Sequence, residues 1–258
     1  MAIMNSMDGK ILKDRVAIVT GGSRGLGKAI AVSLASAGAT LGVVSRKLSG
    51  LNTAAEDIAR AGGEVAIFQA DITDEEQVRR LEREVFGRFG RLDILVNNAG
   101  INLRKPMQEF SLDEWNHVLA TNLTSVFLMC RSFVPHMRGR GYGRILNLTS
   151  IMSHVSFPGR AAYCASKAGL LGFTKALALE LAPDGITVVA ISPGPFATEM
   201  NTAFIRDPEV SQTFVSRIPI GRWGTPSEVG QLACYLCSPD AGFITGTDIL
   251  IDGGWTAQ

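Results

Sequence analysis

Short apolar runs alternate with longer stretches of helical periodicity along most of the chain. The runs lie at 16–20, 41–44, 65–68, 92–96, 144–148, 187–191 and 249–251, and the helical patterns at 26–37, 50–61, 74–89, 111–138, 161–182 and 227–237. Within 74–89, for example, apolar residues recur at Val78, Leu81 and Val85. Buried strands that alternate with helices predict an α/β fold, a doubly wound parallel sheet with helices on both faces.

No linker, low-complexity tract or internal repeat interrupts this alternation. We therefore expect a single domain over residues 1–258, with loops supplying the substrate side and residues 1–12 as a loosely ordered N-terminal extension. A chain of 258 residues with 46% hydrophobic and only 19% charged residues can bury a large core, which excludes a disordered protein.

The charge balance narrows the class of partner. Lys and Arg total 25 and Asp and Glu total 24, a net charge of +1, whereas a partner such as nucleic acid or an anionic membrane usually requires a basic excess. No apolar run reaches membrane-spanning length, and the N-terminus lacks the pattern of a signal peptide. We expect a soluble, cytoplasmic protein that acts on a small molecule.

The four cysteines are too few and too scattered for a disulfide framework. Cys234 and Cys237 have the Cys-x-x-Cys spacing, but they lie in an apolar helical pattern without a second pair or a nearby histidine. They are interpreted as core residues, and no metal site is expected.

A glycine-rich turn joins the first predicted strand to the first predicted helix. It reads Thr20-Gly-Gly-Ser-Arg-Gly-Leu-Gly27. Glycines at such a place let the backbone turn tightly and approach a pyrophosphate, which the N-terminus of the helix attracts. The turn predicts dinucleotide binding.

The spacing Gly-x-x-x-Gly-x-Gly resembles that of the short-chain dehydrogenase/reductase family. Further motifs of that family follow: Asp71, Asn97-Asn-Ala-Gly100, Tyr163-x-x-x-Lys167 and Pro193-Gly194. The resemblance covers the chain from about residue 15 to its end, and it implies a Rossmann-type fold and nicotinamide-dependent oxidoreduction.

The residues after the second strand indicate which nicotinamide cofactor is used. NAD is usually held by a carboxylate about 20 residues past the glycines, but this chain has Ser45 and Arg46 there. An arginine offers charge-assisted hydrogen bonds to a 2′-phosphate, which a carboxylate would repel. Arg24, in the glycine turn, is a second cation. We expect NADP(H).

Tyr163 and Lys167 lie one helical turn apart and so share one face of the predicted helix. We expect the ammonium to lower the pKa of the phenol, which would bring a general acid closer to neutral pH. Ser150 precedes Tyr163 by the family's usual interval and is expected to polarise the substrate oxygen. By the resemblance, Asn122 helps to maintain a water chain to Lys167, and Lys167 also bonds the nicotinamide ribose.

The resemblance implies a larger set of cofactor contacts around these residues. They are Gly21, Ser23, Arg24, Gly25, Leu26, Gly27, Ser45, Arg46, Asp71, Ile72, Asn97, Asn98, Ala99, Gly100, Tyr163, Lys167, Pro193, Gly194 and Thr198.

Three residues are candidates for binding the substrate. Arg104 follows the asparagine motif and could bind a substrate carboxylate, His154 follows Ser150 on a loop beside the pocket, and Phe196 follows Pro193-Gly194. The segment around Arg104, together with residues 196–200, 217–224 and 252–255, resembles those of gluconate 5-dehydrogenases and related sugar-acid enzymes. A small sugar acid is therefore the first expectation.

Two alternatives remain open. One is 3-oxoacyl-carrier-protein reductase, which shares all of these motifs, although Asp184 stands where such reductases place a basic docking residue. The other is a non-catalytic NADP(H)-binding protein, which the intact Ser150, Tyr163 and Lys167 disfavour. The resemblance also suggests a homotetramer built from the helices near 111–138 and 161–182.

Overall fold

The computed structural model describes residues 10–258. Their strands form one sheet in the order β3-β2-β1-β4-β5-β6-β7, with every neighbouring pair parallel. The strands are β1 (Val16–Thr20), β2 (Thr40–Ser45), β3 (Val65–Gln69), β4 (Ile94–Asn97), β5 (Gly143–Leu148), β6 (Ile186–Pro193) and β7 (Asp248–Ile251). The predicted doubly wound parallel sheet is confirmed, and each predicted strand lies within two residues of its observed bounds.

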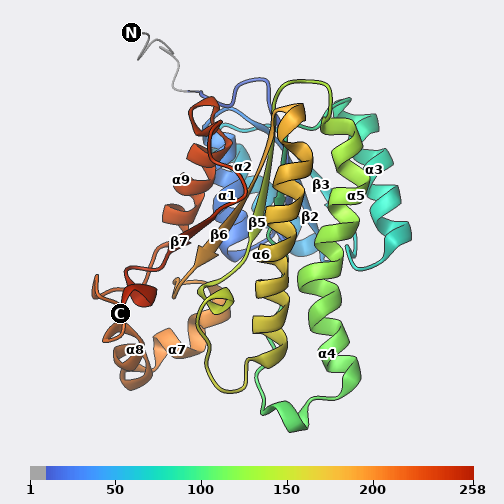
Figure 1. Ribbon diagram of the computed structural model, residues 1–258. Coiled ribbons are helices and arrows are strands. Elements are labelled where there is room, and N and C mark those ends of the chain that lie inside the picture. Colours follow the sequence, from blue (N-terminus) through green and yellow to red (C-terminus); the bar gives the residue numbers. More distant parts are fainter. Residues whose placement is uncertain (1–9) are drawn as a thin grey trace.

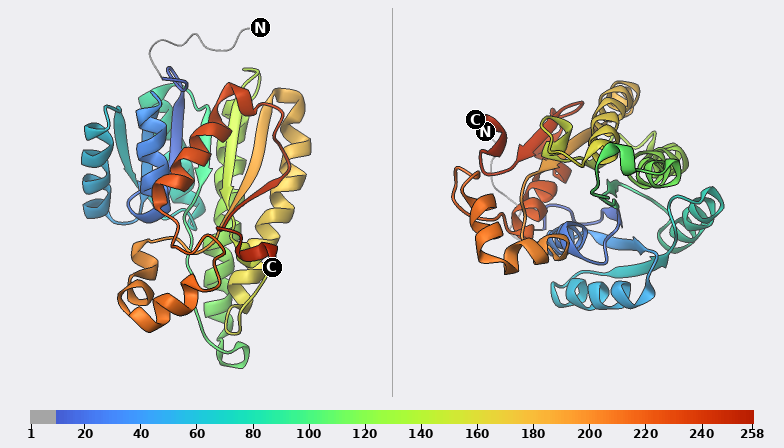
Figure 2. Two further views of the ribbon diagram at one scale, coloured as in Figure 1. Left: turned by 90° about the vertical axis from the view of Figure 1, so that its left-hand side faces the viewer. Right: turned by 90° about the horizontal axis from the view of Figure 1, so that it is seen from below.

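Helices cover both faces of the sheet (Figures 1 and 2). One layer holds α1 (Gly25–Ser36), α2 (Leu48–Arg60) and α9 (Pro226–Cys237), and the other holds α3 (Glu75–Phe89), α5 (Ser125–Met137) and α6 (Ala161–Leu181). Each layer encloses its own apolar cluster against the sheet. Strands such as β1, buried at every position, need this cover on both sides.

Local chemistry sets the ends of these helices. The Asp74 side chain accepts hydrogen bonds from the backbone of Glu76 and Gln77 and caps α3, and Gly90, with φ of +68°, ends it in the left-handed conformation.

Helix α4 (Leu112–Leu119) continues through a π-helical turn, Ala120–Thr124, into α5. The span Leu112–Met137 is long and apolar enough to cross a membrane, but over half of its most apolar window is buried in the fold, as in a core helix.

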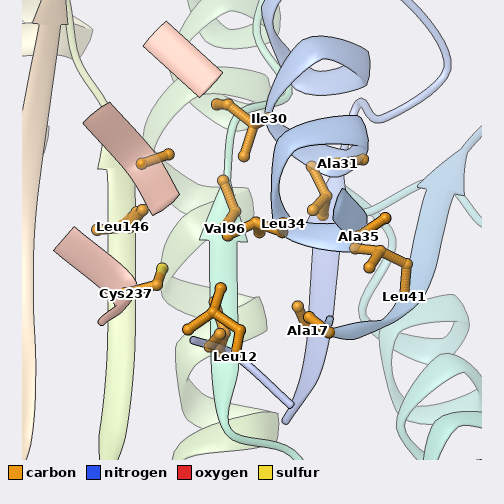
Figure 3. Close-up of a cluster of buried hydrophobic side chains, with 14 of the residues drawn as sticks. Leu12, Ala17, Ile30, Ala31, Leu34, Ala35, Leu41, Val96, Leu146 and Cys237 are labelled. Carbon is orange, nitrogen blue, oxygen red and sulfur yellow. The ribbon is translucent and has the colours of Figure 1, made fainter. Parts of the chain in front are cut away.

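The N-terminal prediction needs a correction. Of the expected loose extension at residues 1–12, residues 1–9 lie outside the described part of the chain. Leu12, however, is fully buried in the cluster between the sheet and helices α1 and α9 (Figure 3), and its amide donates to the Ala37 carbonyl at 2.9 Å. The ordered core therefore begins before residue 13, because an apolar side chain at position 12 reaches it. Cys237 lies in the same cluster, as predicted.

The carboxyl end of β6 leads into two helices where loops were expected. They are α7 (Thr202–Arg206) and α8 (Pro208–Val215), and they lie together at the lower end of the molecule in Figure 1. Asp207 caps α8 by accepting from the amides of Glu209 and Val210, and Pro208 occupies its first turn. Both helices are too short to show a clear apolar period in the sequence.

Candidate active site

A cavity of about 440 Å³ opens at the carboxyl ends of the strands. Its walls come from the loops after β1 to β6, from the start of α6, from α8 and from the C-terminal segment. Ligands of doubly wound sheets bind at this edge, where the loops of strands on either side of the first strand diverge. Here β1 lies between β2 and β4, so the glycine turn after β1 forms the middle of the cavity wall.

The glycine turn is shaped by backbone conformations that other residues rarely adopt. Gly21 has φ of +62° and Gly25 has φ of +55°. A Cβ on Gly21 would lie 2.9 Å from Ala99 Cα, so no larger residue fits between this turn and the loop after β4. The Asn98 side-chain amide fixes the turn by donating to the carbonyl oxygens of Thr20 at 3.0 Å and Gly21 at 3.2 Å.

These features fit a dinucleotide. The narrow glycine cradle lies at the N-terminus of α1, where free backbone N–H groups favour a pyrophosphate. Two residues that were predicted to contact the cofactor do not line the cavity. Gly27 does not line the cavity, since its α-carbon packs against Asn98 and the Gly21 carbonyl, and the buried Asn97 instead donates to Asn147 Oδ1 at 2.9 Å.

At one end of the cavity, polar side chains gather from the ends of β1, β2 and β3. Ser23 Oγ donates to Ser45 Oγ at 3.2 Å, and the exposed Arg46 lies 3.8 Å from the Asp71 carboxylate. Arg24 is exposed beside them. Two guanidinium groups thus border this end of the cavity. The other predicted cofactor residues that line the cavity are Leu26, Ile72, Ala99, Gly100, Pro193, Gly194 and Thr198.

Three of the four predicted catalytic side chains line the opposite part of the cavity. Ser150 follows β5, and Tyr163 and Lys167 lie in the first two turns of α6. The Lys167 amine is 5.8 Å from the centre of the Tyr163 ring and donates to the Leu148 carbonyl at 2.5 Å. The Ser150 hydroxyl accepts from the Met152 amide at 3.1 Å, which leaves its own proton for another acceptor.

The expected lowering of the phenol's pKa is wrong for this structure. Burial raises the pKa of Tyr163 above its ordinary value, and the Ser150 hydroxyl and the Arg160 charge only oppose the rise. Burial also lowers the pKa of Lys167 to about 8. A phenol whose pKa lies above its ordinary value is protonated at neutral pH, so Tyr163 can donate a proton.

Asn122 lies in the π-helical turn and is fully buried. Its side chain accepts from the Ile101 amide at 2.8 Å and donates to the Ile101 carbonyl at 2.9 Å and to Ser166 Oγ at 3.0 Å. Asn122 does not line the cavity. In the structure it ties the loop after β4 to α6, which places the Lys167 amine close to Gly100.

Comparisons with known proteins agree with this geometry. The family model described as enoyl-(acyl carrier protein) reductase matches residues 21–256. The chain is 42% identical over 240 residues to an acetoacetyl-CoA reductase of Shinella zoogloeoides, covering 93% of this chain and 98% of the relative. It is 39% identical over 244 residues to the 3-oxoacyl-[acyl-carrier-protein] reductase FabG of Aquifex aeolicus, covering 94% of this chain and 98% of the relative.

A solved structure provides the same result. A provisionally named gluconate dehydrogenase from Agrobacterium tumefaciens superimposes with a TM-score of 0.92 at 37% identity, covering 96% of this chain and 98% of that one. The chain belongs to the short-chain dehydrogenase/reductase family. It is accordingly an oxidoreductase of CH–OH and carbonyl groups that uses a nicotinamide cofactor.

The substrate end of this short-chain dehydrogenase/reductase differs from the prediction at two residues. Arg104 is exposed outside the cavity wall, with its guanidinium carbon 4.4 Å from the centre of the Phe204 ring in α7. His154 turns away from the cavity because Nε2 bonds Asp248 Oδ2 at 2.5 Å. Phe196 is buried in the cavity wall as expected.

Sequence reasoning missed a second arginine at this end. Arg160, the residue before α6, lines the cavity close to Tyr163. Its pKa is lowered first by burial and then by the neighbouring charge of Arg104, so the two guanidinium groups face one region. The sequence did contain a signal for Arg160, because it precedes Tyr163 by three residues. Four aromatic side chains also line the cavity: Phe157, Phe214, Trp223 and Trp255.

Proposed function

We propose that this protein interconverts a ketone and a secondary alcohol with NADP(H), and that the substrate is a small polar sugar acid such as gluconate or 5-ketogluconate. The observation that carries the reaction is the meeting of Ser150, Tyr163 and Lys167 in the cavity that the glycine turn also lines. A non-catalytic NADP(H)-binding protein would have no use for a buried phenol beside a free serine hydroxyl.

The proton chemistry follows from the ionisation of these side chains. Tyr163 is protonated at neutral pH because burial raises its pKa, so it can donate its proton to the oxygen of a ketone. The Ser150 hydroxyl can donate a hydrogen bond to the same oxygen. The Lys167 ammonium stabilises the phenolate that remains, which a neutral residue could not do. When bound, the nicotinamide supplies or accepts the hydride.

The two arginines at the far end support NADP(H) rather than NAD(H). Arg24 and Arg46 border the cavity beside Ser23 and Ser45. A 2′-phosphate would gain charge-assisted hydrogen bonds there. The Asp71 carboxylate would compete with the 2′-phosphate for Arg46. The 3.8 Å between Arg46 and Asp71 and the exposure of Arg46 indicate that this ion pair is weak.

Two further arginines support an anionic substrate. Among the described residues, neither Arg104 nor Arg160 forms an ion pair with a carboxylate, and both lie close enough to Tyr163 to oppose the rise of its pKa. A carboxylate a few atoms from the reacting carbon would pair with Arg160 while the carbonyl meets Tyr163. Burial of an arginine without a counter-charge is costly, and a substrate anion offsets that cost.

The relatives favour a second candidate, reduction of a 3-oxoacyl thioester. Both curated relatives are named for such substrates, and the aromatic side chains Phe157 and Phe214 would suit an acyl chain. Against docking of an acidic carrier protein, the Arg138 guanidinium is already paired with Asp184 at 3.2 Å.

A comparison of two ketones tests the proposal. We expect NADPH oxidation, followed by absorbance, to be faster with 5-ketogluconate than with acetoacetyl-CoA. Arg160→Gln should raise KM for 5-ketogluconate by about tenfold, the loss of one charge-assisted hydrogen bond, whereas the remote surface variant Arg83→Gln should not. Faster turnover of acetoacetyl-CoA supports the second candidate, and NADPH binding without any turnover supports a binding protein.

The assembly is also part of the proposal. Large apolar side chains are exposed on the helices expected to build a homotetramer, among them Leu112, Phe127 and Leu179. Such residues are typical of subunit interfaces. The molar mass in solution decides whether they are covered. The cytoplasmic location stays a prediction.

A further inference from the structure

The glycine turn leaves an open space in front of Gly25, which has φ of +55°. Gly25 is the second glycine of the motif, and in dinucleotide-binding turns this residue lacks a side chain so that the backbone can approach the pyrophosphate. Outside α1 itself, the three atoms nearest to an added Cβ belong to the segment after β6. They are Glu199 Oε2 at 3.4 Å and two carbon atoms of Thr198, each at 3.9 Å. The nearest of them is thus a carboxylate oxygen.

The residues on either side of Glu199 hold its backbone in this place. The Thr198 amide and the Asn201 side-chain amide both donate to the carbonyl oxygen of Phe196 at 2.9 Å. The Asn201 backbone amide donates to the Thr198 carbonyl, also at 2.9 Å. Phe196 is buried in the cavity wall, and Glu199 lines the same cavity. The position of the Glu199 carboxylate beside the glycine turn therefore follows from how this segment is anchored.

The Glu199 carboxylate has no neutralising cation within ion-pair distance in the described part of the chain, residues 10–258. Arg24 directly precedes Gly25, but its side chain is exposed and forms no such pair with Glu199. The N-terminus of α1 attracts anions through its free N–H groups. Glu199 is therefore an anion of the protein's own at the place where the dinucleotide would present its phosphates.

A pyrophosphate bound at Gly25 would meet this charge. Each of its phosphates is negative at neutral pH, and like charges a few ångströms apart repel each other. Either the carboxylate stays and repels the pyrophosphate, or it swings away and loses the attraction of the helix N-terminus. Both responses lower the affinity for the dinucleotide. Because the Glu199 side chain is exposed, water and salt screen its charge, and the expected effect is moderate.

We propose that Glu199 limits the affinity of the protein for its dinucleotide, because its carboxylate opposes the pyrophosphate at Gly25. NADPH and NADH share the pyrophosphate, so Glu199 weakens the binding of both by the same factor. Arg24 and Arg46, in contrast, act on the 2′-phosphate that only NADPH carries. A limited affinity favours release of the cofactor after each hydride transfer, and product release limits the turnover of many enzymes. The inference rests on the proposed placement of the dinucleotide and not on the proposed substrate.

Glu199→Gln tests the charge, because glutamine keeps the shape of the side chain and removes its charge. In a fluorescence titration at low salt, the Kd of NADPH should fall by about fivefold, the effect of one charge at a helix N-terminus. The Kd of NADH should fall by the same factor. In about 1 M NaCl, where the Debye length is about 3 Å, the variant and the wild type should differ by less than about twofold.

A control variant and a control ligand separate this effect from a general change of charge. Glu209→Gln removes the same charge from an exposed position on α8 that does not line the cavity, and it should leave both Kd values unchanged. Adenosine 2′-monophosphate has the 2′-phosphate but no pyrophosphate. Its inhibition constant in competition with NADPH should therefore be the same for the wild type and for Glu199→Gln.

The proposal is overturned if Glu199→Gln leaves the Kd of NADPH unchanged or raises it, if Glu209→Gln has an equal effect, or if NADPH gains affinity and NADH does not. These titrations need no turnover. If the wild type reduces neither ketone but Glu199→Gln binds both dinucleotides more tightly, the proposed function fails and the role of Glu199 stands. If the wild type is active and its affinity is insensitive to Glu199, the function stands and the role of Glu199 fails.

Discussion

The cofactor end of the cavity is formed mainly by backbone groups, and the substrate end mainly by side chains. At the cofactor end, the backbone makes the site: Gly21 and Gly25 adopt positive φ angles, and Asn98 fixes the turn through carbonyl oxygens. At the substrate end, side chains make it, with Arg160, Phe157 and Trp255 contributed by segments up to about a hundred residues apart. A site made by the backbone is lost when one of a few glycines is substituted, whereas a site made by side chains can be altered by one substitution at a time.

The largest expected loss of cofactor affinity tests the cofactor end, where the backbone makes the site. Gly21→Ala should weaken NADPH binding by about 100-fold, because a Cβ there is strained by the positive φ and meets the backbone of Ala99. Gly62→Ala is the matched control, since Gly62 has φ of +81° but nothing within 4 Å of an added Cβ. It should lower the thermal midpoint without changing the Kd. Equal losses of affinity in a fluorescence titration would show that the cradle is not where the dinucleotide binds.

A smaller effect tests the charge at the same end. Arg46→Asp should lower the NADPH over NADH preference in kcat/KM by about 30-fold, because a second carboxylate beside Asp71 would repel a 2′-phosphate. The change should leave KM for the ketone unaltered, since Arg46 lies at the cofactor end. An unaltered preference would refute the assignment of Arg46 to the 2′-phosphate.

The smallest effect, a change of kcat with pH, tests the substrate end. Burial lowers the pKa of Lys167 to about 8, so the amine loses its proton as the pH rises through 8. The kcat for ketone reduction should therefore fall about fourfold between pH 7 and 8.5, in step with the ammonium fraction. Lys167→Arg, which stays charged, should show no such decline whatever its absolute rate. A wild-type profile that is flat across this range would separate Lys167 from the proton step.

The same contrast explains how far the sequence could be interpreted. The strands, the sheet and the glycine turn were predictable because each depends on local spacing: apolar runs in β1 or β5, and glycines at fixed intervals before α1. Helices α7 and α8 were missed because five and eight residues are too few to display a period.

The substrate end was predictable only in part. His154 was expected in the pocket because it follows Ser150, but a carboxylate 94 positions away holds it elsewhere. Arg104 was expected to face the pocket, but it lies outside the cavity wall against the Phe204 ring, and Arg160 lines the wall instead. The ionisation of Tyr163 was misjudged for a similar reason, because the neighbour along the helix was visible in the sequence and the burial was not.

The most direct test of the central claim is the turnover of Tyr163→Phe, measured beside its affinity for NADPH. The account predicts that kcat falls by about three orders of magnitude or more, since a general acid is removed, while the Kd of NADPH changes less than about threefold, since the ring remains. Turnover near that of the wild type, with NADPH still bound, would contradict the claim that the Tyr163 phenol donates the proton.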